Sequence, residues 1–294
     1  MPGKVTSGLG MVAIGRDGVR HIGFKAPDGP GLELEVLDRE EIGRRAVNTL
    51  GEPHRTGFHR LMLVDAGQTW HEVDFVEYRL GPGTVLWVRP GQVQRFGPPV
   101  DGELVLFTDE APASPSTELA RLLGDIHRGP AWRPGTAAYA GIREMARQLR
   151  LEADCHTASG DEARRHLLSV MLLRIGRTDT DGPALGDPDS VAARFAAAVE
   201  RDFARTHRVA DYAGRLGYSV RTLTRASTAA TGLSARELLD ARITLEAKRL
   251  LAYTDLAVAA VSRRLGFSEP TNFGKFFLRR TGRTPAAFRR TFTR

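Results

Sequence analysis

Hydrophobic and polar positions divide the chain into parts with different periodicity. From Gly31 to about Phe107, short apolar runs of β type alternate with Gly and Pro residues. Strand-like runs that recur at roughly 8–12-residue spacing are typical of an all-β barrel or sandwich. The clearest runs are residues 60–64, 74–80, 84–89 and 103–107.

After Pro115 the apolar spacing becomes helical, which predicts helices at residues 117–126, 136–151 and 161–175. The last of them contains Leu167 to Leu173, a stretch that is apolar nearly all round. Such a helix must be buried. Two alternatives remain open: burial against the β domain, or against a second subunit.

Residues 177–190 are polar, rich in Gly, Asp, Thr and Pro, and without an apolar period, which predicts a linker. Helical patterns continue from there to the last residue. The fold class is therefore α+β multidomain. The expected divisions are a β domain at 1–112, a helical dimerisation region at 113–176, the linker at 177–190 and an all-α domain at 191–294.

A short phrase occurs twice in the all-α part. Arg-Leu-Gly-Tyr-Ser at residues 215–219 returns as Arg-Leu-Gly-Phe-Ser at 264–268, 49 positions later. Each copy follows a short apolar helical run and precedes a second one that ends in Thr-Gly. Helix, glycine turn, serine cap and second helix indicate a helix-turn-helix, and two copies indicate a protein that binds double-stranded DNA.

In the first unit we expect Gly217 to end one helix and Ser219 to cap the next. Arg221, Arg225 and Thr228 share an outward face, with Thr222 and Thr224 at its margins. Arginine suits the O6 and N7 atoms of guanine in the major groove. The face expected to pack inward holds Val220, Leu223, Ser227 and Ala230.

The second unit repeats this plan, with a turn at Gly266, a cap at Ser268 and Pro270 in the first helical turn. Its expected core stripe is Phe273, Phe276 and Phe277. The expected base-reading residues are Thr271, Asn272 and Lys275, and the expected phosphate contacts are Arg279 and Arg280.

Ser234 to Glu237 has the pattern of a capping box that opens a helix running to about Tyr253. A helix of some 20 residues is about 30 Å long. That length approaches the roughly 34 Å of one DNA turn. One chain is therefore expected to reach two successive major grooves.

The net charge of +7 is unevenly distributed. From Asp187 onward there are 20 Lys and Arg against 10 Asp and Glu, and before it 22 against 25. A basic last third is typical of a nucleic-acid-binding domain. Cys155 is the only cysteine, which excludes an internal disulfide and a thiolate zinc cluster. Without an apolar leader or membrane-spanning run, we expect a cytoplasmic protein with no membrane partner.

The all-α part resembles the AraC/XylS family of bacterial transcription regulators. The resemblance covers residues 213–228, 265–277 and 282–290. By position, it implies base reading by Arg221, Thr224 and Arg225 in the first unit and by Pro270, Thr271 and Lys275 in the second. Pro270 has no side-chain donor, so the second unit is expected to discriminate bases less than the first.

The upstream part is similar, more loosely, to the cupin-like sensory domain of that family. Phe58-His59, Gly67, His71, Val73-Asp74 and residues 83–91 carry the similarity. It implies a β-barrel with a small-molecule effector inside, a homodimer formed by the following helices and, for an activator, contact with RNA polymerase. The candidate effector-binding residues are His59, His71, Trp87, Gln94 and Phe96.

Cupins can also be metal-dependent enzymes, whose chemistry needs several His residues and a carboxylate on one metal. His54, His59 and His71 could converge, but Gln94 stands where a further ligand would be expected. No Ser/His/Asp or Cys/His nucleophile spacing and no phosphate-binding glycine loop occurs. We expect no enzyme, metal or cofactor. A metallo-enzyme fused to a DNA reader and a ligand-independent regulator remain the alternatives.

Overall fold

The structure is a computed structural model that describes residues 5–7, 10–14, 20–24, 32–46, 51–113, 116–124, 129–153, 157–178 and 190–292. The described residues form two compact units, one within residues 5–14 and 20–178 and the other at residues 190–292. Of the expected linker at 177–190, residues 179–189 lie outside the described part. Cys155 lies outside it as well.

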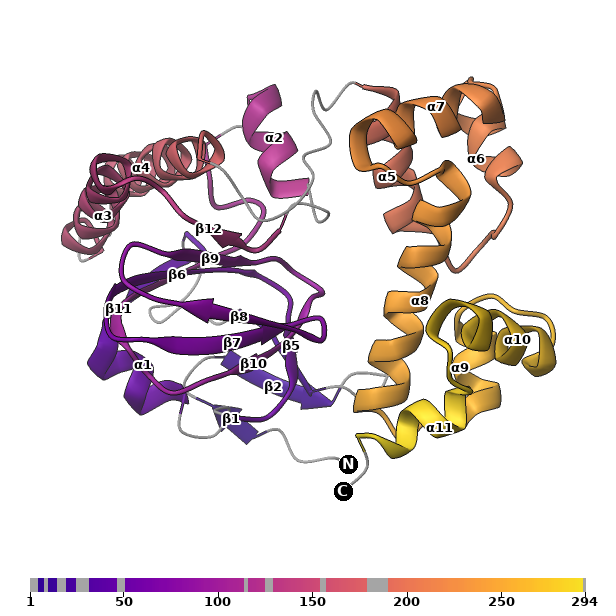
Figure 1. The fold of residues 1–294 in the computed structure, drawn as a ribbon. Coiled ribbons are helices and arrows are strands. Elements are labelled where there is room, and N and C mark those ends of the chain that lie inside the picture. Colours follow the sequence, from indigo (N-terminus) through magenta and orange to yellow (C-terminus); the bar gives the residue numbers. More distant parts are fainter. Residues whose placement is uncertain are drawn as a thin grey trace. The chain divides into compact units, whose positions relative to one another are not determined.

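The first unit contains two β-sheets (Figure 1). The seven-stranded sheet has the order β1-β2-β3-β5-β10-β7-β8, and the five-stranded sheet has the order β12-β9-β6-β11-β4. The strands of the first sheet are β1 Val5–Ser7, β2 Gly10–Ile14, β3 Arg20–Ile22, β5 His54–Thr56, β10 Val93–Phe96, β7 Thr69–Val73 and β8 Val76–Leu80. Those of the second are β12 Ala131–Trp132, β9 Val85–Val88, β6 His59–Ala66, β11 Asp101–Phe107 and β4 Leu34–Leu37.

Three of the four predicted strands match β6, β9 and β11, and the fourth is wrong at its start. Asp74 and Phe75 have φ angles of 51° and 71° and form the turn between β7 and β8. The turn is held from outside, because the Asp74 carboxylate accepts a hydrogen bond from the Val93 backbone N–H at 3.1 Å. Left-handed turn residues suit the twist of a tight hairpin. The sequence pattern therefore merged a turn with the strand that follows it.

Other elements of the first unit were not predicted. They are the strands before residue 31, helix α1 at Arg39–Ala46 inside the expected β region, and β12 inside the expected helical region. β12 pairs with β9, Ala131 opposite Leu86 and Trp132 opposite Val85. The helical region is thereby joined to the five-stranded sheet.

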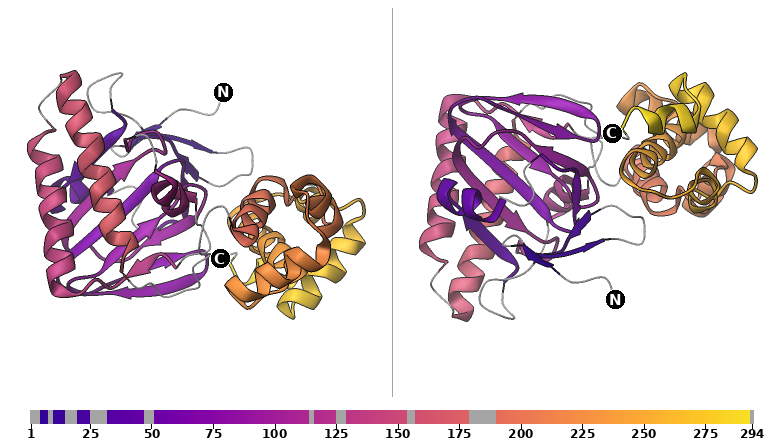
Figure 2. Two further views of the ribbon diagram at one scale, coloured as in Figure 1. Left: turned by 90° about the horizontal axis from the view of Figure 1, so that it is seen from above. Right: turned by 90° about the horizontal axis from the view of Figure 1, so that it is seen from below.

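Helices α2 (Thr117–Gly124), α3 (Thr136–Leu151) and α4 (Ala158–Gly176) pack against one face of that sheet; α3 and α4 lie side by side (Figure 2). Leu61 and Trp87 of the sheet share a core with Met171 of α4. Leu168 and Leu172 are also buried there, whereas Val170 is 43% exposed. The apolar run at 167–173 is therefore buried mostly within the unit, with Val170 as an exception.

The second unit is helical, and α8 (Ala235–Tyr253) forms its long central rod (Figure 1). The other helices are α5 Val191–Asp202, α6 Val209–Leu216, α7 Val220–Thr231, α9 Val258–Arg264, α10 Pro270–Thr281 and α11 Pro285–Arg290. Helices α5 to α7 lie around one end of α8, and α9 to α11 lie toward its other end. Two helix pairs thus share one rod, as the repeated phrase predicts.

Candidate DNA-binding surface and ligand chamber

The first helix pair has the predicted turn and cap. Gly217 ends α6 with a φ angle of 74°, a backbone conformation that favours glycine. Ser219 then caps α7, because its side chain accepts a hydrogen bond from the Thr222 backbone N–H at 3.1 Å. This turn sets the direction in which α7 leaves α6.

One face of α7 points to solvent. Arg221, Arg225 and Thr228 are exposed, and Thr222 and Thr224 are half-buried. Leu223 and Ser227 lie in the core, as predicted. Val220 does not, since it is 44% exposed. Val220 is the first residue of α7, and the buried residues of this helix begin at Leu223. Its predicted inward position is therefore wrong.

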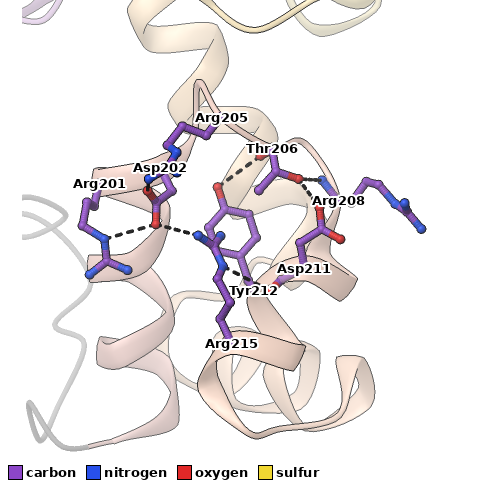
Figure 3. Close-up of polar contacts among 8 residues, drawn as sticks. All are labelled: Arg201, Asp202, Arg205, Thr206, Arg208, Asp211, Tyr212 and Arg215. Carbon is purple, nitrogen blue, oxygen red and sulfur yellow. Dashed lines mark hydrogen bonds and ion pairs between the residues drawn. The ribbon is translucent and has the colours of Figure 1, made fainter.

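The arginine of the first copy of the phrase is part of the internal structure. The Arg215 guanidinium donates a hydrogen bond to the Asp202 carboxylate at 2.9 Å and lies 4.9 Å from the ring centre of Tyr212. Figure 3 shows Asp202 between Arg215, Arg201 and Arg205. Burial opposes ionisation, yet these guanidinium groups hold the pKa of the Asp202 carboxyl below its ordinary value. Arg215 therefore fastens α6 to α5.

The rod α8 starts at the predicted capping box. The Ser234 side chain accepts from the Glu237 backbone N–H, and the Glu237 carboxylate accepts from the Ser234 N–H at 2.8 Å. The helix ends at Tyr253, as predicted. Its 19 residues correspond to a length of about 28 Å. Most of its residues are buried by the surrounding helices.

The second helix pair turns at Gly266, whose φ angle is 84°. A Cβ atom at this position would overlap the carbonyl oxygen of Ala204, so glycine is required for space as well as for conformation. The predicted cap at Ser268 is wrong. Helix α10 begins at Pro270, its N-cap is Glu269, and that residue makes no side-chain cap hydrogen bond.

The two outward helices correspond at a spacing of 50 residues rather than 49. Both have 12 residues, and each ends at a glycine with φ near 70°, Gly232 and Gly282. The extra residue lies between the phrase and α10. Pro270 is therefore the structural equivalent of Val220, and Thr271 of Arg221. Pro270, which has no side-chain donor, therefore stands at the position of a valine. The polar Thr271 stands at the position of Arg221.

The exposed face of α10 carries the predicted polar residues. Thr271, Asn272, Lys275 and Arg279 are all exposed, as is Ser268 before the helix. Phe273, Phe276 and Phe277 are buried as predicted. At the 50-residue spacing Lys275 corresponds to Arg225 and Asn272 to Thr222. At the positions of Arg221 and Arg225, both helices therefore expose hydrogen-bonding side chains.

In the β-sheet part of the chain, the structure separates the candidate effector-binding residues into two groups. His59 and Trp87 lie on the face of the five-stranded sheet that α2 to α4 cover. His71, Gln94 and Phe96 belong to β7 and β10 of the other sheet and lie together. Alternation along a strand explains the separation, because His59 and Arg60 of β6 must point to opposite sides.

Both ring nitrogens of His59 have hydrogen-bond partners. Its Nδ1 atom accepts from the Trp87 indole N–H at 3.1 Å, so its Nε2–H donates to Asp109 at 2.7 Å. Burial lowers the pKa of His59, while the hydrogen bond with Asp109 opposes that shift. His59 and Trp87 thus join the sheet to its helical cover, and the structure does not bring them together with His71, Gln94 and Phe96.

The second group surrounds a buried cation that the sequence analysis overlooked. The Arg60 guanidinium lies 4.0 Å from the ring centre of Phe96 and donates to His54 Nε2 at 3.1 Å. The His71 Nε2–H donates to the Gln94 side-chain oxygen at 3.1 Å. All of these residues are almost completely buried. The sequence signal for this buried cation is a charged residue, Arg60, at an inward position of the apolar strand β6. We call Arg60, His54, His71, Gln94 and Phe96 the ligand chamber.

A pocket opens beside the ligand chamber and shares His71 and Phe96 with it. Its cavity volume is about 30 Å³, within about 500 Å³ of empty space that includes open solvent. Its other lining residues are Ile42, Gly43, Met62, Leu63, Thr69, Trp70, Gly97, Pro98, Pro99, Val100, Gly102 and Glu103. Phe96 therefore forms a wall between the pocket and Arg60.

Metal binding has no support within the part of the chain that the structure describes. His54 and His71 lie in the ligand chamber, but His59 is on the other side of β6. Among the described residues, no three His, Cys, Asp or Glu side chains are placed to hold a metal ion. Likewise, no helix there is long and apolar enough to cross a membrane.

Comparison with known proteins matches each unit to a family. Residues 42–169 match the AraC-like ligand binding domain, and residues 212–291 match a helix-turn-helix domain. Together with the fold, they define a transcription regulator with a ligand-binding β domain and a tandem helix-turn-helix DNA-binding domain. The chain belongs to the AraC/XylS family.

Individual relatives agree with this. The chain is 26% identical to the transcriptional activator RhaS of Enterobacter sp. (strain 638), over 80% of its own length and 86% of the relative. It is 28% identical to the activator RhaR of Escherichia coli O139:H28, over 54% and 57%. These relatives are transcriptional activators, so the metallo-enzyme alternative is not retained.

Solved structures give weaker similarity. ToxT of Vibrio cholerae is 12% identical with a TM-score of 0.41, over 89% of this chain and 98% of that one. The DNA-binding domain of AdpA, crystallised with a target DNA, is 33% identical with a TM-score of 0.32, over 35% and 93%.

Proposed function

We propose that the exposed faces of α7 and α10 read promoter DNA. Arg221, Thr224 and Arg225 would contact base edges in one major groove, and Thr271, Asn272 and Lys275 those in the next. The observation that carries this is the exposure of Arg221 and Arg225 on α7, with Thr271 and Lys275 exposed at the equivalent positions of α10. Ser219, Thr222, Ser268 and Arg279 lie at the margins of these faces and would contact phosphates.

The two reading helices would act as one body, because α8 joins them. This rod is capped at its start, largely buried and about 28 Å long. We infer that a single chain covers two successive groove segments on one face of the duplex.

We also propose how the regulator is controlled. A small-molecule effector in the β domain would shift the population between two arrangements of a homodimer on promoter DNA. Two exposed apolar residues of the helical cover, Leu151 and Val170, support a contact between two copies there. As an activator the protein would also contact RNA polymerase. A promoter-binding regulator would act in the bacterial cytoplasm.

A second candidate is a ligand-independent regulator whose β domain only dimerises. The small cavity volume, about 30 Å³, favours it, because this is room for only about one or two water molecules. An effector that displaced Phe96 would gain the space of that ring.

The test of DNA reading is the recovery of genomic fragments by the purified full chain. We expect a shared sequence among the recovered fragments, lost when Arg221 and Arg225 are both replaced by Ala. Arg79→Ala, on an exposed side chain of the β domain, is the control and should recover the same fragments. Recovery of fragments without any common sequence would contradict the proposal.

A further inference from the structure

Arg60 is a buried cation without a carboxylate partner among the described residues. It belongs to β6, lies opposite Val88 of β9 and Leu106 of β11, and is 3% exposed. Both neighbours are buried apolar residues. Its Nη1 donates to His54, but its Nη2 has no hydrogen-bond partner. Buried charges are normally paired, because an unpaired one keeps the cost of leaving water.

A second donor in the ligand chamber is also free. The Gln94 side-chain oxygen accepts from His71, and the Gln94 Nε2 group has no partner, although the residue is 1% exposed. Gln94 lies directly opposite His54 on the neighbouring strand, and His54 in turn contacts Arg60. The two free donors therefore belong to one connected group of side chains.

The charge of this group comes from Arg60. Burial lowers the pKa of Arg60 to about 9, which still leaves it protonated at neutral pH. Burial and the nearby Arg60 charge lower the pKa of His71 to about 3, so His71 is neutral. His54 donates through Nδ1 to the Glu52 carbonyl oxygen and accepts at Nε2 from Arg60, which is the pattern of a neutral ring. The ligand chamber thus offers one positive charge and donors, which suits an anion.

The surroundings describe the rest of such a ligand. Phe96 separates Arg60 from the neighbouring pocket, and Met62, Pro98 and Val100 are among the pocket residues. A molecule that displaced the Phe96 ring would meet the guanidinium at one end and apolar side chains at the other. A carboxylate has two acceptor oxygens, one for each free donor.

We infer that the β domain binds a small organic acid. Its carboxylate contacts Arg60 and Gln94, and its apolar part lies toward the neighbouring pocket, which Met62 and Val100 help to line. This rests on the proposed control by a small-molecule effector and names the chemical class of that effector.

The test is thermal unfolding of the full chain with paired probes at equal ionic strength. The acids are acetate, butanoate, hexanoate and benzoate, and each is compared with its primary amide. We expect the acids with an apolar body to raise the unfolding temperature and the amides not to. In Arg60→Met the affinity for the acid should fall about 10- to 100-fold. Arg95→Met removes an arginine of β10 that pairs with Glu72 and is partly exposed, and should respond like the wild type.

Gln94→Glu provides a second variant if Arg60→Met does not fold. It keeps an acceptor for His71 and places a carboxylate inside the ligand chamber, so the response to added acids should fall. If no acid raises the unfolding temperature above its amide, the inference is wrong. It is also wrong if inorganic phosphate alone gives the same rise as hexanoate or benzoate, or if Arg60→Met responds like the wild type.

DNA binding is measured on the same samples without any acid. A chain that selects a DNA sequence but ignores every acid contradicts only this inference. A chain that binds acids but selects no sequence contradicts the proposed DNA reading instead.

Discussion

Gly217 and Gly266 stand at the same place in the two copies of the repeated phrase, yet they carry different constraints. Both have positive φ angles. Only at Gly266 does the backbone of another segment, at Ala204, fill the space of a Cβ atom. The repeat predicts the conformation of both glycines, but the contact depends on a loop elsewhere in the fold.

Replacing each glycine by alanine measures this difference. Gly217→Ala should cost about 1–2 kcal/mol of unfolding free energy, because only the left-handed conformation is penalised. Gly266→Ala should cost at least about 3 kcal/mol, because the Ala204 carbonyl must also move. Urea unfolding of the two variants checks the order. Equal losses would show that the close approach at Gly266 is absent.

Arg225 is one of the two exposed arginines of α7 that we propose to read bases. Arg225→Ala should cost about 1–3 kcal/mol of specific binding and relax the preference at one base position. Fluorescence anisotropy with a cognate duplex and with single-base variants measures both effects. A uniform loss on every duplex would instead identify Arg225 as a phosphate contact.

At the scale of elements, the two reading helices begin in different ways. Ser219 caps α7 and Ser234 caps α8, but α10 starts from Glu269 and Pro270 without a side-chain cap. The pattern around Ser268 is similar to that around Ser219, but Pro270, two residues later, begins α10 and makes Glu269 its N-cap. Similar letters therefore gave a correct cap in one copy and an incorrect one in the other.

Two serine variants test this reassignment. Ser234→Ala should destabilise the protein by about 1 kcal/mol, because the capping hydrogen bonds of α8 are lost. Ser268→Ala should change stability by less than about 0.5 kcal/mol, since its side chain caps nothing. Thermal unfolding of both variants provides the comparison. A loss at Ser268 as large as that at Ser234 would restore the original assignment.

Sequence reasoning was most successful where structure is local. Apolar spacing and the capping box predicted α3 and α8 with the bounds observed. It failed where partners are distant in the chain: β12 is a strand because it pairs with β9, and the Asp74 turn is held by Val93. For the same reason His59 and Trp87 were placed in a site with His71, although strand alternation puts them on the helix-covered face.

At the scale of the whole molecule, the chain combines a ligand-binding β domain with a helix-turn-helix DNA-binding domain, in which α7 and α10 carry different polar residues. The structure changes the reason for which α10 is expected to discriminate bases less than α7. Pro270 takes the place of Val220, so it removes no reading residue. The difference lies instead in Thr271 for Arg221, Gly274 for Thr224 and Lys275 for Arg225. The proposed reading residues of α10 therefore include no arginine, the side chain whose planar fork fixes two parallel donors.

The central claim is that one chain reads two successive groove segments, and that α7 reads more of the sequence than α10. Selection of binding sites from random duplex DNA by the full chain tests it directly. The expected result is two blocks of preferred bases with centres about 10 base pairs apart, with stronger preferences in one block that weaken in Arg225→Ala. A single block, or two blocks with equal preferences, would contradict it.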